Sequence, residues 1–198
     1  NLTRWPDEIN NKWSHGTDKS FLKGLSDYWC NEFDWRVHER KLNEIGSFKY
    51  TSDSGLKLHF LHSKSNNDNA IPLVMTHGWP GSVQEFIKII PIIQKNSNIP
   101  LDIICPSLPG FGFSDKPKTE GMNSKEIAKL QHELIMALGY KKYIVQGGDW
   151  GATISKWMAE LFKDACIGIH LNMVIAWPQA SDNPMENVTE NEQKLLAN

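Results

Sequence analysis

The sequence predicts an α/β fold in which a mostly parallel sheet carries helices on both faces. Between residues 48 and 177, short stretches of strand length alternate with longer stretches of helical periodicity, a pattern typical of right-handed crossover units. The strand-length stretches are short and rich in apolar residues, and Leu73–Thr76 is nearly continuously apolar, as expected for parallel strands buried on both faces. The chain has 198 residues, of which 40% are hydrophobic, so it is long enough for one domain with a sizeable core.

Five stretches have the length and apolar character of strands. They are Leu56–Leu61, Leu73–Thr76, Leu101–Cys105, Tyr143–Val145 and Cys166–Asn172. Residues that favour turns follow several of them: Gly78 closely follows the second, and Pro106 stops the third. In a sheet of this kind, chemistry gathers at the carboxyl ends of the strands. The loops after Thr76, Cys105 and Val145 are therefore where functional residues are expected.

Three stretches between these strands are predicted to be helices. Ser124–Leu138 is the clearest, because its apolar residues recur at helical spacing, with Asn123 as a capping residue in front and Gly139 behind. Its stripe consists of Ile127, Leu130, Leu134 and Leu138. Glu85–Ile93, despite its β-branched residues, and Thr153–Phe162 are the other two.

The chain divides by texture into three parts. Residues 1–47 are rich in tryptophan and charge and are expected to form short helices, with their rings packed against another surface. Residues 48–177 form the α/β part, and residues 178–198 are a polar segment that begins at Pro178.

Composition excludes several classes of protein. The net charge is −2, so nothing indicates a nucleic-acid groove or a polybasic membrane patch. No apolar run approaches the roughly 18 to 20 residues of a membrane-spanning helix. Cys30, Cys105 and Cys166 are far apart and are expected to be free thiols. No histidine pair has metal-ligand spacing, and no metal is predicted.

A short segment after the fourth strand has the pattern of a nucleophile elbow. In Gly147-Gly148-Asp149-Trp150-Gly151, small residues stand two before and two after the central residue, between a strand and a helix. The central residue is Asp149, and no G-x-S-x-G pattern occurs. An aspartate is ionised at neutral pH without a general base, and it can open a strained carbon centre and become esterified. The alternative is that Asp149 only caps the following helix.

The loop after the second strand, His77-Gly78-Trp79-Pro80-Gly81-Ser82, is a candidate oxyanion loop. Such a loop aims one backbone N–H at the nucleophile, and the residue after the nucleophile supplies a second. Here those donors are the amides of Trp79 and Trp150. They would stabilise the negative charge that develops when water attacks an ester on Asp149. An ordinary turn is the alternative.

Two further features have structural interpretations. Pro106–Ser114 contains Gly-Phe-Gly but lacks the third glycine and the following helix of a dinucleotide site, so it is expected to be an apolar loop on the substrate side. None of the seven histidines is an obvious hydrolytic base. His77 is expected to be a hydrogen-bonded support, and His170 a core histidine.

Taken together, these segments resemble epoxide hydrolases of the alpha/beta-hydrolase fold, in their microsomal and juvenile-hormone type. The elbow, His77–Ser82 and Pro106–Ser114 resemble the loops of that family. Upstream, Arg4–Glu8 and several positions between Tyr28 and Asn43 resemble its N-terminal region. Nearly the whole chain is covered, and its tail from Thr189 to Ala197 resembles the start of the family's cap.

The resemblance implies hydrolysis of a small apolar epoxide by water to a vicinal diol, without a cofactor or a nucleic-acid partner. Asp149 matches the nucleophile, and the N–H groups of Trp79 and Trp150 match the oxyanion donors. The family's cap tyrosines, histidine base and its acid partner lie downstream of the region covered. The chain is therefore expected to be incomplete at the C-terminus: an N-terminal region (1–47), part of the core (48–177) and the start of the cap (178–198). By itself it should be alkylated once without turnover.

Two alternatives remain open at this point. A haloalkane dehalogenase shares the fold and the aspartate nucleophile, and indole N–H groups such as those of Trp79 and Trp150 can hold a halide. The tryptophan-rich N-terminal region argues against it. A non-catalytic relative that binds an apolar ligand is the other. The sequence indicates neither membrane association nor a cellular compartment.

Overall fold

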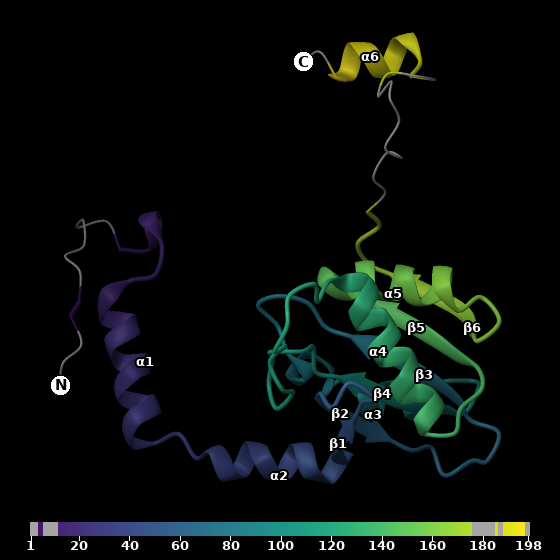
Figure 1. Ribbon diagram of the computed structural model, residues 1–198. Coiled ribbons are helices and arrows are strands. Elements are labelled where there is room, and N and C mark those ends of the chain that lie inside the picture. Colours follow the sequence, from purple (N-terminus) through teal and green to yellow (C-terminus); the bar gives the residue numbers. More distant parts are fainter. Residues whose placement is uncertain (1–3, 6–11, 176–184, 186–187, 197–198) are drawn as a thin grey trace. The chain divides into compact units, whose positions relative to one another are not determined.

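The computed structural model describes residues 4–5, 12–175, 185 and 188–196. The chain divides into two units, Asn1–Ile45 and Gly46–Asn198 (Figure 1).

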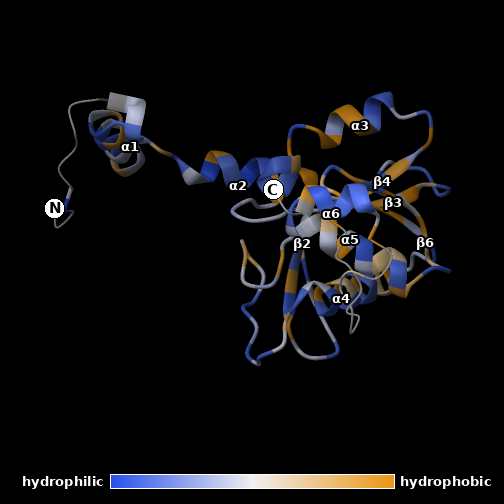
Figure 2. Ribbon diagram, turned by 90° about the horizontal axis from the view of Figure 1, so that it is seen from above, coloured by the Kyte–Doolittle hydropathy of each residue, from blue (hydrophilic) through white to orange (hydrophobic). Residues whose placement is uncertain are grey.

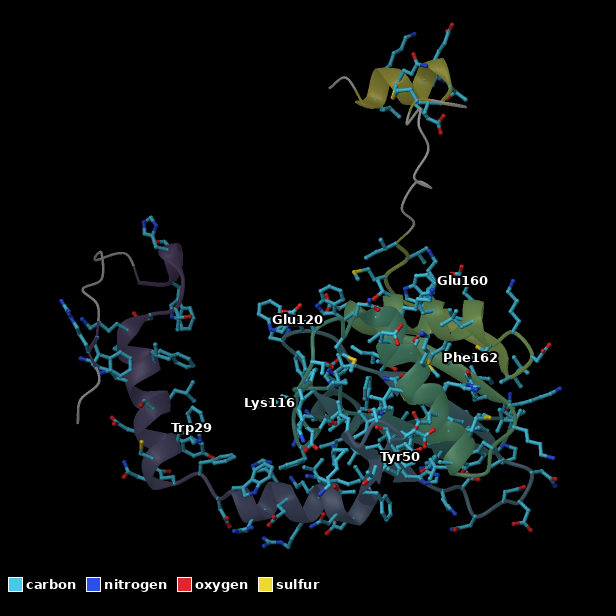
Figure 3. All side chains as sticks on the ribbon, viewed as in Figure 1. Trp29, Tyr50, Lys116, Glu120, Glu160 and Phe162 are labelled. Atoms are coloured by element: carbon cyan, nitrogen blue, oxygen red, sulfur yellow. The ribbon has the colours of Figure 1, made fainter. Side chains whose placement is uncertain are left out.

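The first unit is helical, as the sequence predicts. It contains a 3₁₀ turn and two α-helices: η1 (Lys12–His15), α1 (Lys19–Asn31) and α2 (Trp35–Ile45). Asp18 caps α1, because its Oδ1 accepts the backbone N–H of Phe21 at 2.9 Å. Between the helices, the ring of Phe33 stacks on His38 with centroids 5.0 Å apart. Trp29 projects from α1 (Figure 3).

The second unit contains a sheet, its helices and a short terminal helix. Its strands are β1 (Ser47–Thr51), β2 (Lys57–Ser63), β3 (Ile71–Thr76), β4 (Leu101–Pro106), β5 (Tyr143–Gly147) and β6 (Cys166–Leu171). Its helical elements are η2 (Val83–Phe86), α3 (Ile90–Asn96), α4 (Ser124–Ala137), α5 (Trp150–Leu161) and α6 (Glu190–Leu196). Residues 178–184, 186–187 and 197–198 of the expected cap segment lie outside the described residues.

Within the described residues, the strands form one six-stranded sheet in the order β1-β2-β4-β3-β5-β6. The pairs β3–β4, β3–β5 and β5–β6 are parallel, and β1–β2 and β2–β4 are antiparallel. The mostly parallel sheet is thus confirmed. The strand β1 was not predicted, because its residues Ser-Phe-Lys-Tyr-Thr alternate between polar and apolar and do not form the apolar run that marks the central strands β3 and β4.

Helices cover both faces of the sheet, as predicted. Figure 2 shows α3 on one side of the strands and α4 and α5 on the other. Asn123 caps α4 by accepting the N–H groups of Lys125 and Glu126. Gly139 follows α4 with φ +89°, a left-handed conformation that favours glycine.

The helix predicted over Glu85–Ile93 is wrong in its bounds. The chain forms the 3₁₀ turn η2 first, and α3 starts only at Ile90. Pro91 explains the shift, because a proline has no N–H for a helical hydrogen bond and is tolerated only in a first turn.

The core lies between the sheet and the α4–α5 layer. It joins buried strand residues such as Leu58, Val74 and Val145 to Leu134 of α4 and Ile154 of α5. Side chains also tie the layers together. Tyr50 of β1 (Figure 3) donates its hydroxyl to Glu133 of α4 at 2.7 Å.

The cysteines agree with the sequence prediction. The three cysteines are free thiols, and Cys105 is buried. Among the described residues, no group of histidine, cysteine, aspartate and glutamate could hold a metal ion. No helix in the described part of the chain is long and apolar enough to cross a membrane.

Candidate active site

Asp149 stands at a sharp turn between β5 and α5. Its backbone has φ 52° and ψ −128°. Asn66 is the other non-glycine residue with positive φ in the described part of the chain. This region of backbone conformation is sparsely populated and costs on the order of 1 to 3 kcal/mol, and such residues cluster at functional sites.

The flanking glycines are required by the close approach of backbone segments. A Cβ on Gly147 would overlap the carbonyl of Gly151, and a Cβ on Gly151 would overlap the carbonyl of Thr76 at the end of β3. Neither neighbour is a side chain that could swing away. The small residues of the elbow pattern are therefore explained by the packing of α5 against β5 and β3.

The carboxylate of Asp149 does not cap α5. No hydrogen bond joins its side chain to the backbone N–H groups of that helix. Its Oδ1 instead accepts the backbone N–H of Trp79, across 70 positions of sequence, at 2.7 Å. Within the described residues this is the one hydrogen bond recorded for the carboxylate. The capping alternative is therefore wrong.

Gly78 lets the two loops come this close. A Cβ at Gly78 would overlap the side chain of Asp149. The loop after β3 thus approaches the nucleophile candidate with its backbone rather than with a side chain, which is the geometry that an amide donor needs.

His77 holds the loop after β3 in place through hydrogen bonds of its ring. Its buried ring bridges two loops: Nε2 accepts the backbone N–H of Leu108 at 3.1 Å, and Nδ1 lies 2.9 Å from the carbonyl of Gly78. Because an amide N–H donates to Nε2, the proton of the neutral ring is on Nδ1. Burial lowers the pKa of His77, against the opposing effect of the Gly78 hydrogen bond. The expectation that His77 is a hydrogen-bonded support is confirmed.

A cavity of about 620 Å³ opens in front of Asp149. Its lining combines apolar side chains, polar side chains and glycines. The lining residues are Thr76, Gly78, Trp79, Pro80, Gly81, Glu85, Phe86, Gln146, Gly148, Asp149, Asn172 and Met173. The nucleophile candidate and the Trp79 amide therefore face the same space.

Trp150 is the first residue of α5. The first N–H groups of a helix have no acceptor within it, so the Trp150 N–H has the character required of the second oxyanion donor. The Trp79 N–H donates directly to the Asp149 carboxylate. The assignment of the Trp150 N–H as the second oxyanion donor remains a prediction from its place in the chain.

Two expectations about the surroundings need correction. Residues 106–114 contribute nothing to the lining of this cavity, and Leu108 of that loop instead holds His77. His170 is exposed rather than part of the core, because β6 is the edge strand of the sheet in the described chain.

The predicted site residues do not include Gln146 and Asn172, which also line the cavity. Gln146 lies near the end of β5, and Asn172 directly follows β6. The side-chain oxygen of Gln146 is buried and has no partner among the described residues. Their position at the carboxyl ends of parallel strands was the available signal.

Two family models match the sequence of this chain. Residues 71–197 match the family model described as alpha/beta hydrolase fold. The chain belongs to the alpha/beta hydrolase family. Residues 1–86 match a second model, described as the epoxide hydrolase N terminus.

Individual relatives agree with these family matches. Juvenile hormone epoxide hydrolase 2 of Ctenocephalides felis is 41% identical over 165 residues, which cover 80% of this chain and 35% of that protein. Epoxide hydrolase 1 of Sus scrofa is 39% identical over 176 residues, covering 84% of this chain and 38% of that protein. The resemblance to epoxide hydrolases is confirmed.

A solved structure supports the same assignment. The crystal structure of juvenile hormone epoxide hydrolase from the silkworm Bombyx mori superposes with a TM-score of 0.79 at 37% identity, covering 86% of this chain and 47% of that one. The chain therefore spans less than half the length of each of these three relatives.

Proposed function

We propose that this chain carries the nucleophile half of an epoxide hydrolase that converts small apolar epoxides into vicinal diols. The observation that carries the proposal is the strained Asp149, whose Oδ1 accepts the Trp79 N–H while the carboxylate faces a cavity. The similarity to named epoxide hydrolases supports the same reaction class.

The contact between Asp149 and Trp79 distinguishes the two carboxylate oxygens. Oδ1 is held by the amide, so Oδ2 is the oxygen that attacks a ring carbon of the epoxide. The C–O bond of the ring breaks, its electron pair goes to the epoxide oxygen, and that oxygen takes a proton. The product of this half-reaction is a hydroxyalkyl ester on Asp149.

The second half-reaction is hydrolysis of that ester. Water adds to the carbonyl carbon of Asp149, and negative charge develops on Oδ1. The Trp79 N–H already lies 2.7 Å from this atom, and the Trp150 N–H is proposed as the second donor. Loss of one such donor costs roughly 3 to 4 kcal/mol of barrier. Collapse then releases the diol and regenerates the carboxylate.

Turnover also needs groups to protonate the epoxide oxygen and to activate water. We propose that these come from the cap tyrosines and histidine base implied by the family resemblance, outside residues 1–198. In that scheme residues 1–47, 48–177 and 178–198 are the N-terminal region, part of the core and the start of the cap. Water and an apolar epoxide are the partners.

Mass spectrometry tests the nucleophile directly. Incubation of the chain with styrene oxide should add one epoxide mass to the peptide that contains Asp149, and Asp149→Asn should abolish the adduct. Asparagine tolerates positive φ, so this variant keeps the elbow. Asp164→Asn, which changes an exposed carboxylate outside the cavity, is the matched control and should react normally.

Two outcomes would contradict the proposal. One is a folded sample that shows no adduct, which would favour a non-catalytic binding protein. The other is an adduct, with release of chloride, formed from a chloroalkane but not from the epoxide, which would favour a dehalogenase.

A further inference from the structure

Gly148 is the one glycine of the elbow that backbone packing does not explain. A Cβ on Gly147 or Gly151 would overlap a main-chain carbonyl, and at Gly147 it would also meet the Ser155 hydroxyl, whereas the atoms nearest a Cβ on Gly148 all belong to one side chain. Its φ is outside the positive range that favours glycine. The reason for glycine at this position is therefore the atoms that occupy the place where its Cβ would stand.

Asn172 occupies that space. A Cβ on Gly148 would lie 3.0 Å from both Cγ and Nδ2 of Asn172, and it would overlap Oδ1. Real Cβ atoms essentially never come closer than this, so either the Asn172 amide or the elbow would have to move.

The sheet holds Asn172 against the elbow. In the β5–β6 ladder Gly147 pairs with Leu171, the residue before Asn172. The backbone N–H of Asn172 then donates to the carbonyl of Gly147 at 3.4 Å. The end of β6 is thereby tied to the peptide two residues before the nucleophile.

The contact acts on the segment that sets the position of Asp149. Gly148 directly precedes Asp149, and its carbonyl accepts the N–H of Ala152 at 3.2 Å in the first turn of α5. Asn172 also lines the cavity that contains the carboxylate. A strained residue persists only when its surroundings over-determine it, and Asn172 is a side chain in position to do so.

We infer that Asn172 is a positioning residue for Asp149, and that position 148 is glycine because the Asn172 amide fills the site of its Cβ. This inference rests on the proposed role of Asp149 as the nucleophile. It assigns to the residue that follows β6 a part in the active site, in addition to the elbow and the oxyanion loop.

A double-mutant cycle tests it, with the rate of adduct formation on Asp149 and the thermal midpoint as separate readouts. Gly148→Ala should slow alkylation by styrene oxide about tenfold, since coupled contacts of this kind change rates by such factors. Asn172→Gly should slow it by only about threefold. The double variant should react as fast as Asn172→Gly alone, because the added methyl then has room.

Gly168, in the strand β6 that precedes Asn172, provides a matched control. The Cβ of Gly168→Ala would make only ordinary contacts with Ile144, at 3.5 Å. Its effect on alkylation should be small and the same whether position 172 is asparagine or glycine. If Gly148→Ala fails to fold, the double variant should still fold.

Independent effects would overturn the inference. The effects of Gly148→Ala and Asn172→Gly would then multiply in rate and add in thermal midpoint, or Gly148→Ala would have no effect. Absence of an adduct on the unmodified chain would overturn the proposed function instead, and the thermal midpoints would still decide whether the two residues are coupled.

Discussion

Asp102 and Asp149 lie at opposite ends of the same sheet and have opposite environments. Asp102, at the start of β4, is buried and accepts three hydrogen bonds, from the N–H and hydroxyl of Ser65 and from the hydroxyl of Tyr140. Asp149, after β5, is exposed to a cavity and accepts one, from Trp79. A carboxylate with its acceptor sites occupied stabilises the fold, and one with an unoccupied oxygen can react.

The hydrogen bonds of Asp102 also change its pKa. Burial would raise the pKa of Asp102, but the hydrogen bonds from Ser65 and Tyr140 outweigh burial and lower it. The network extends further, because His62 lies 3.1 Å from the Tyr140 hydroxyl. Asp102 thus connects β4 to β2 and to the segment after α4, and it has no part in the cavity.

The largest expected effect comes from breaking the backbone contact at the reactive end. Gly151→Ala would drive a methyl group into the carbonyl of Thr76. It should lower the free energy of unfolding by about 3 kcal/mol or more. Urea denaturation measures this, and Gly168→Ala, at about 1 kcal/mol or less, is the control. Equal losses in the two variants would contradict the role given to Gly151.

Exchange of each aspartate for asparagine tests the comparison directly. Asp102→Asn keeps the shape but cannot accept all three hydrogen bonds, so it should cost about 2 to 3 kcal/mol of stability while leaving the Asp149 adduct unchanged. Asp149→Asn should abolish the adduct and change stability by less than about 1 kcal/mol. Urea denaturation and mass spectrometry on both variants provide the four measurements. Similar stability losses would show that the two environments do not differ as described.

A smaller effect on stability is expected at acid pH from His59, whose two ring nitrogens both have hydrogen-bond partners. Its ring lies between the hydroxyls of Ser47 and Ser107, at 2.9 and 2.8 Å. Burial, assisted by the positive charge of Lys49, lowers the pKa of His59 to about 4.

The unfolded chain, with a histidine pKa near 6.5, therefore binds a proton that the folded chain excludes between about pH 6.5 and 4. Stability from this group is complete above that window and is lost as the pH falls through it, by on the order of 1 to 2 kcal/mol between pH 7 and 5. Denaturation of the wild type and His59→Gln at several pH values checks this. Parallel profiles would exclude His59 as the cause.

The sequence by itself determined the local features of this protein. The alternation of strands and helices, the capped helix from Ser124, and the elbow around Asp149 depend on residues close together in the chain. Their physical causes are equally local: apolar periodicity, a side-chain cap, and glycine where no side chain fits. The choice of Trp79 as an amide donor followed from the position of its loop after a strand.

Tertiary structure decided what depends on residues far apart. The order of the strands brings the backbone nitrogen of Trp79 within 2.7 Å of Oδ1 of Asp149. It also places the Asn172 side chain where a Cβ of Gly148 would stand. The same order leaves His170 on an edge strand, although its apolar neighbours suggest a core position. No local pattern encodes these contacts, because pairing between strands depends on the packing of the whole sheet. The sequence therefore contains the reactive groups, and the pairing of the strands determines which of these groups are in contact.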